Sequence, residues 1–89
     1  MTTTTEVVIE CRISGGHAGI YDSKGLGIMW FPKEKQGSCV DYMEQKVRAV
    51  RKGGQSVRVK VGTRHISITD DKEGSYKDLR TVLFKEMRG

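Results

Sequence analysis

The sequence predicts an α+β fold of about five mainly antiparallel strands and two amphipathic helices, in the order βββαββα. Three observations support this prediction. Several stretches alternate apolar and polar residues, as half-buried strands do, and two others repeat apolar residues every three to four positions, as helices do. Clusters of glycine and polar residues separate these stretches. With 89 residues, the chain suffices for a single compact domain over residues 1–89 with one modest core.

The first three predicted strands precede Pro32. Residues 5–13 have a period of two and give one apolar face, formed by Val7, Ile9, Cys11 and Ile13. After two glycines, residues 17–21 form a short second strand that ends in the turn signal of residues 22–25. The returning strand, residues 26–31, is the most apolar window of the sequence. Glycines weaken these strands by propensity, so packing has to hold them in place.

Trp30 and Phe31 are neighbours within the third predicted strand. Adjacent strand residues point to opposite faces of a sheet, so only one of the two rings can be fully buried. The sequence leaves open which one. We expect the other to be an exposed contact residue, and we take Trp30 as the candidate anchor for a partner.

The first predicted helix begins at Ser38, which has capping-box spacing to Asp41. Its apolar stripe consists of Cys39, Val40, Met43, Val47 and Val50. Basic residues at its end suit the negative end of the helix dipole, and Gly53 and Gly54 supply a left-handed cap.

A second hairpin follows, with strands at residues 55–61 and 64–69 joined by a tight turn at Gly62 and Thr63. Its inward residues are Val57, Val59, Val61, Ile66 and Ile68. Beyond a solvated loop, Ser75 repeats the capping-box spacing with Asp78 and begins the second helix. The apolar stripe of that helix consists of Tyr76, Leu79, Val82, Leu83 and Met87.

No pattern of catalytic residues is visible, so we expect a protein that is not an enzyme and that uses no cofactor. Two cysteines and two histidines, Cys11, His17, Cys39 and His65, have the ligand types of a zinc site. Their spacing is scattered and both cysteines fall on apolar faces, so we predict core thiols and no metal. The glycines of residues 15–27 do not lead into a helix, which argues against a phosphate-binding loop.

Charge gives the stronger functional signal. The chain has 16 Lys and Arg against 11 Asp and Glu, a formal net charge of +5 and a pI near 9.4. Such a surplus attracts anionic partners. One side of the fold is predicted to gather six cations, which with Trp30 form the predicted partner-binding set: Arg48, Arg51, Lys52, Arg58, Lys60 and Arg64. The alternative is a solvated face that serves solubility and the helix dipole.

Residues 39–74 also resemble part of a phosphotyrosine-binding domain of the PH-like superfold. The resemblance lies in the helix CVDYMEQKVRAVRKGGQ and the following SVRVKVGTRHISITDDKEG. In that family, such a helix leads into a strand of alternating valines and then a strand ending in an Asp-rich turn. The resemblance implies a reduced PH-like fold and a non-enzymatic module that binds an anionic protein or phosphopeptide.

The sequence therefore predicts a non-catalytic binding or adaptor module that recognises an anionic protein partner. The alternative is a small regulatory nucleic-acid-binding protein that contacts phosphates with the same cations; a small enzyme is a third, weaker hypothesis. Homodimerisation by strand-edge pairing is open as well. We expect residues 1–4 to be disordered and the protein to be cytoplasmic, because it shows neither a signal peptide nor a membrane span.

Overall fold

A computed structural model describes residues 6–88, so the expectation for residues 1–4 lies outside the described part of the chain. The element order confirms the predicted βββαββα arrangement. The elements are β1 (Glu6–Ser14), β2 (His17–Tyr21), β3 (Gly27–Phe31), the 3₁₀ turn η1 (Lys33–Lys35), α1 (Gln36–Lys52), β4 (Ser56–Val61), β5 (Arg64–Ile68) and α2 (Glu73–Arg88). Neither helix has the length and apolar character needed to cross a membrane.

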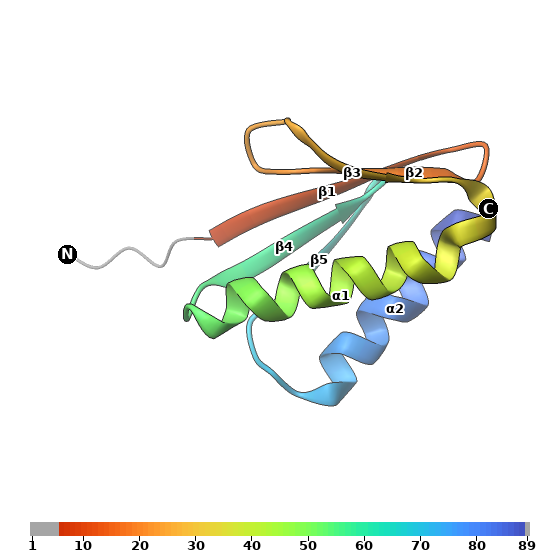
Figure 1. Cartoon of the computed structure of the whole chain (residues 1–89). Helices are drawn as coiled ribbons and strands as arrows, with labels where there is room; N and C mark the ends of the chain where they lie inside the picture. Colours follow the sequence, from red (N-terminus) through yellow and green to blue (C-terminus); the bar gives the residue numbers. More distant parts are fainter. Residues whose placement is uncertain (1–5, 89) are drawn as a thin grey trace.

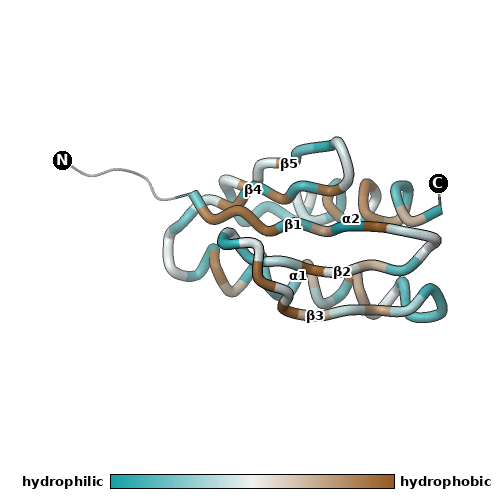
Figure 2. Tube along the Cα trace, turned by 90° about the horizontal axis from the view of Figure 1, so that it is seen from above, coloured by the Kyte–Doolittle hydropathy of each residue, from teal (hydrophilic) through white to brown (hydrophobic). Residues whose placement is uncertain are grey.

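The five strands form one mixed sheet in the order β3-β2-β1-β4-β5. β1 and β4 are parallel, and every other neighbouring pair is antiparallel. A parallel pair needs a long connection, which here consists of the β2–β3 hairpin and α1. Figure 1 shows that both helices lie on the same side of the sheet. The opposite face of the sheet is left without a helical cover, as the view in Figure 2 also shows.

The core lies between the sheet and the helices and follows the period of each element. Val57, Val59 and Val61 are fully buried, whereas Arg58 between them is exposed on the open face. The helices contribute the stripes predicted from their spacing: Cys39, Val40, Met43 and Val47 from α1, and Tyr76, Leu79, Leu83 and Met87 from α2. No buried side-chain nitrogen or oxygen within residues 6–88 lacks a hydrogen-bond partner.

Both helices begin two residues earlier than predicted, and neither uses the expected capping box. α1 begins at Gln36 without a side-chain cap, because η1 leads into it directly from Pro32, whose carbonyl accepts a hydrogen bond from Lys35 N at 2.9 Å. Ser38 therefore lies inside the first turn. α2 begins at Glu73, and the loop before it is held by Asp70, whose Oδ1 accepts hydrogen bonds from Ser75 Oγ at 2.7 Å and from Lys72 N at 3.0 Å.

The second hairpin forms as predicted, with Val61 opposite Arg64 across a two-residue turn. Gly62 in that turn has φ of +59°, a left-handed conformation that favours glycine. At the end of α1 the left-handed residue is Gly54, with φ of +82°, while Gly53 keeps a negative φ. The predicted glycine cap therefore depends on the second glycine of the pair.

Candidate partner-binding surface on the β3 edge

β3 lies at one edge of the sheet, and its outer side has no neighbouring strand within residues 6–88. Ser14 and His17 flank the two-residue turn between β1 and β2, so their backbones pair with each other. Backbone groups of successive strand residues point to alternate sides, so Ala18 and Ile20 of β2 face β3. They are opposite Phe31 and Met29.

The same alternation turns the backbone N–H and C=O of Trp30 away from β2, toward the free side of the edge. Pro32, two residues further on, would point the same way, but proline has no N–H to donate. The free edge that β3 offers for pairing is therefore short and centred on Trp30.

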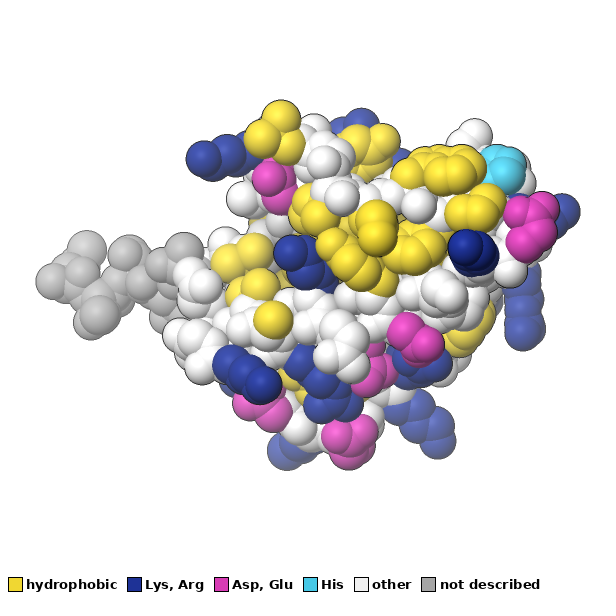
Figure 3. Space-filling model, viewed as in Figure 1, with side chains coloured by type: hydrophobic (Ala, Val, Ile, Leu, Met, Phe, Trp, Pro, Cys, Tyr) yellow, Lys and Arg dark blue, Asp and Glu magenta, His cyan; other side chains and the backbone are white. Residues whose placement is uncertain are grey.

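Large hydrophobic side chains are exposed on this same segment. Within residues 6–88 the exposed large hydrophobics are Leu26, Met29 and Trp30, with 62%, 46% and 60% of their surface accessible. All three belong to the β2–β3 hairpin. Figure 3 shows hydrophobic side chains gathered along this hairpin and the adjoining side of α1. We call Leu26, Met29, Trp30 and the free backbone of Trp30 the β3 edge surface.

The question left open for Trp30 and Phe31 is settled by their positions. Phe31 is buried and packs against Tyr42 of α1, with ring centroids 5.6 Å apart. Trp30 points to the open face of the sheet, where it stacks on His17 at 5.4 Å with 25° between the rings. The prediction that one ring is exposed is confirmed, and the exposed ring is Trp30.

A second aromatic group lies beside Trp30 on the open face. The guanidinium of Arg12 sits 4.2 Å from the centre of the Tyr21 ring. The ring covers Gly19, where an added Cβ would lie only 3.0 Å from a ring carbon of Tyr21. Gly19 is also opposite Trp30 in the β2–β3 register. The glycine thus leaves room for the Tyr21 ring over the backbone of β2.

Of the predicted cations, three lie near the end of α1, on the helical side of the sheet. Arg48 pairs with Glu44 at 3.1 Å and with Glu73 at 3.2 Å. Its guanidinium also stacks 3.9 Å from the centre of the Tyr76 ring. Neighbouring carboxylates raise the pKa of Arg48, with the hydrogen bond to Glu44 as the main cause.

Arg51 is engaged as well, through Asp71 at 3.3 Å and the carbonyl of Gln55 at 3.0 Å. Lys52, the third cation at this end of α1, is exposed and has no ion pair within the described residues. Arg48 and Arg51 therefore tie α1 to the loop before α2 and are poorly placed to meet a partner.

The other three predicted cations lie elsewhere. Arg58 and Lys60 are on the open face, paired with Glu6 at 3.4 Å and Glu10 at 3.9 Å. Arg64 is opposite buried Val61, on the helical side, and pairs with Glu86 at 3.0 Å. The six cations thus occupy three separate surfaces, and five of them already have acidic partners.

Sequence reasoning missed the lysines around the β3 edge surface. Lys24 is in the hairpin turn, Lys33 and Lys35 follow β3, and Lys46 lies on α1 next to the hairpin. None of these four lysines has an ion pair among the described residues. One acidic residue, Glu34, lies between Lys33 and Lys35 in the sequence. The sequence signal that could have identified these lysines is their position on both sides of residues 26–31, the most apolar window of the chain.

The four residues weighed as zinc ligands do not come together. Cys11 and Cys39 are fully buried free thiols that contact each other in the core. The hydrogen bond between them, together with burial, raises the pKa of Cys11, so this thiol stays protonated. His17 is exposed, with Nδ1 accepting a hydrogen bond from Lys33 N at 3.0 Å, and His65 is exposed on β5. No group of three potential metal ligands occurs within residues 6–88.

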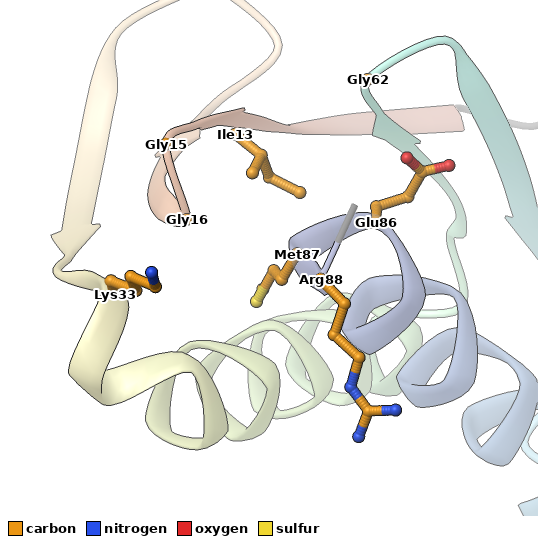
Figure 4. A pocket seen from close by; sticks show the side chains of 8 residues that line it. All are labelled: Ile13, Gly15, Gly16, Lys33, Gly62, Glu86, Met87 and Arg88. Atoms are coloured by element: carbon orange, nitrogen blue, oxygen red, sulfur yellow. The ribbon is translucent and has the colours of Figure 1, made fainter.

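A cleft of about 530 Å³ lies where α2 ends beside the β1–β2 and β4–β5 turns. Figure 4 shows Ile13 and Met87 at its centre, Glu86 directed toward Gly62 and Arg88 directed away. Glu86 is its one carboxylate and is engaged by Arg64. The described residues that line it therefore provide neither a nucleophile with a base nor a pair of carboxylates.

Compared with models of known protein families, with curated protein sequences and with solved structures, the chain matches none of them. The resemblance of residues 39–74 to phosphotyrosine-binding domains therefore stays a prediction.

Proposed function

We propose that the protein is a non-catalytic binding module that recognises an anionic protein partner, and that the partner docks on the β3 edge surface. One observation carries the proposal. All the exposed large hydrophobics of residues 6–88 lie on one hairpin at a free sheet edge. Isolated exposed apolar residues are common, but a group of them on one element is typical of an interaction site.

The residue types fit a protein partner. Trp, Tyr and Arg are the side chains that most often dominate the binding energy of protein interfaces. Here all three lie on the open face, where Trp30 stacks on His17 and the Arg12 guanidinium lies over the Tyr21 ring. Their preorganisation lowers the entropy lost on binding.

Charge favours an anionic partner. The formal net charge of +5 attracts acidic surfaces, and the lysines that flank the hairpin form no ion pair among the described residues. The same net charge opposes pairing of the β3 edge with a second copy of the chain. We therefore favour a different protein over a homodimer.

The test is affinity capture from a lysate of the native host, with and without nuclease, comparing the wild type with Trp30→Ser and with His65→Ser at the opposite edge. We expect one or more proteins to be captured by the wild type and by His65→Ser after nuclease treatment, and to be lost with Trp30→Ser. Capture that is equal for all three proteins would contradict the proposal.

A nucleic-acid partner is the second candidate, favoured by the exposed ring of Trp30 and the half-buried ring of Tyr21 on a sheet face that also carries Arg58 and Lys60. Phosphates would have to displace Glu6 and Glu10 from these cations, which is why we place this candidate second. It predicts a mobility shift of single-stranded DNA or RNA that weakens steeply with salt. No shift at low salt would remove it.

A further inference from the structure

The sheet is open at one corner next to the β3 edge surface. β1 pairs with β4 from Glu6 onward, but its ladder with β2 extends only to Glu10, opposite Tyr21. Beyond that pair, the β2–β3 turn lies alongside β1 (Figure 2) without any backbone hydrogen bond to β1 among the described residues. The first part of β1 therefore has a partner strand on one side only.

The backbone of Val8 faces this open corner. Ser14 pairs with His17 across the tight turn, so Glu10 and Val8, at even spacing from Ser14, point their N–H and C=O toward the β2 side. Glu10 meets Tyr21 there, but Val8 has no described partner. Backbone groups of this kind are strong hydrogen-bonding sites for an incoming chain.

A small apolar cleft occupies the same corner. Its volume is about 130 Å³, and its apolar walls are Val7, Val8, Ile9, Ile28 and Val50. This is well below the roughly 300 Å³ at which pockets for drug-sized ligands begin, so the cleft has room for about one aliphatic side chain. The ladder at Glu10 and Tyr21 closes its inner end. A chain that enters along β1 cannot continue between β1 and β2 and has to end or turn away there.

Two charged residues also line the cleft. Lys46 on α1 has no ion pair within the described residues and can reach an anion bound there. Asp22 is committed to its own turn, because its Oδ1 accepts hydrogen bonds from Lys24 N and Leu26 N at 2.9 Å each. Asp22 keeps its negative charge in these hydrogen bonds, and Lys46 is the charged side chain of the lining that has no described partner.

We infer that this cleft binds the C-terminal residue of the partner protein. The aliphatic side chain of that residue lies against Ile28 and Val50, its backbone pairs with Val8, and its terminal carboxylate meets the ammonium group of Lys46. The inference rests on the proposed function, because it assumes a protein partner docked at the β2–β3 hairpin. It adds the chemistry of the partner: a free C-terminus with an aliphatic last residue.

The test is a titration of ¹⁵N-labelled protein, followed by NMR, with the tripeptide N-acetyl-Ser-Val-Leu carrying a free C-terminus. We expect the amide shifts to change mainly at Val8, Ser23 and Ile28. The C-terminally amidated peptide should bind about tenfold more weakly, since it lacks the charge-assisted contact with Lys46. Replacing its last residue by serine should also weaken binding. Shift changes elsewhere, or equal affinity of the acid and amide forms, would overturn the inference.

Lys46→Met should reduce the affinity for the free acid to that for the amide. Lys77→Met is the matched control, because Lys77 is exposed on α2, has no ion pair among the described residues and does not line the cleft. If both variants bind the free acid as the wild type does, the carboxylate site is elsewhere and the inference fails.

Trp30→Ser separates this inference from the proposed function, because Trp30 does not line the cleft. Tripeptide binding that survives in Trp30→Ser, while capture of the whole partner is lost, supports both. If capture of the partner depends on Trp30 but the tripeptide does not bind, the inference about the cleft is overturned and the proposed function stands. Tripeptide binding with capture that is indifferent to Trp30 overturns the proposed function of the β3 edge surface but keeps the cleft.

Discussion

The two edges of the sheet are built differently. β5 ends the sheet on one side, and the register from Val61 and Arg64 turns the backbones of His65 and Ser67 outward. Both side chains are exposed and polar. β3 ends the sheet on the other side with exposed Trp30 on one face and exposed Met29 on the other.

This contrast indicates different roles for the two edges. Polar residues at an edge keep it soluble without a partner, whereas an apolar edge invites one. β3 also carries devices that limit unrestricted pairing: a register shift at Ile20 and Tyr21, and Pro32 directly after the strand. We therefore expect β3 to serve binding and β5 to serve stability.

The largest expected effect concerns stability. Ile68 of β5 is 1% exposed, so Ile68→Ala should lower the free energy of unfolding by about 2–5 kcal/mol. Met29 of β3 is 46% exposed, and Met29→Ala should cost less than about 1 kcal/mol. Urea denaturation of both variants measures the difference. Equal losses would show that the two edges support the fold alike.

The next effect concerns binding. Trp30→Ser should weaken binding of the captured partner by about 2 kcal/mol or more, a roughly 30-fold rise in Kd, as expected for a central aromatic contact. His65→Ser should leave affinity unchanged. Titration calorimetry with the purified partner measures both, and thermal unfolding of each variant checks that the fold is intact. A larger loss for His65→Ser would assign binding to the other edge.

A smaller effect than that of Trp30→Ser is expected from charge reversal, which compares lysines beside β3 with cations on β4. Lys24→Glu with Lys33→Glu removes cations beside β3 that have no described ion pair, and should slow association with the partner on the order of tenfold at low salt. Arg58→Glu with Lys60→Glu changes cations that Glu6 and Glu10 already neutralise, so we expect a weaker effect. Stopped-flow association rates of the two double variants decide this. A larger loss of association rate for Arg58→Glu with Lys60→Glu would indicate that the partner binds at the cations of β4.

The smallest effect belongs to the loop after β5. Hydrogen bonds from the Ser75 hydroxyl and the Lys72 N–H lower the pKa of Asp70. A carboxylate with a lowered pKa in the folded state contributes stability above its unfolded pKa, and this contribution disappears as the pH falls through the folded value. Wild type should therefore lose more stability than Asp70→Asn between about pH 5 and about pH 2. Thermal unfolding across this range measures it; parallel curves would contradict the role of Asp70.

The element order was predictable because its signals are local. The alternating valines of β4 and the apolar stripes of both helices determine which faces are buried, whatever lies elsewhere in the chain. The helix starts were wrong because Pro32 and Asp70, outside the predicted helices, decide where each one begins.

The candidate site was harder to predict for a physical reason. Whether a cation is free depends on acids far away in sequence: Arg48 meets Glu73, 25 residues later, and Arg64 meets Glu86. Sequence pattern identified Trp30 as a candidate anchor and limited the exposed ring to Trp30 or Phe31. Only the packing of Phe31 against Tyr42 decided between them.

The most direct test of the account is amide hydrogen exchange, resolved by residue, in the free protein and in its complex with the captured partner. The account predicts that the outward amide of Trp30 exchanges readily in the free protein and becomes protected in the complex, while the outward amides of His65 and Ser67 do not change. Protection at His65 and Ser67 with none at Trp30 would contradict it.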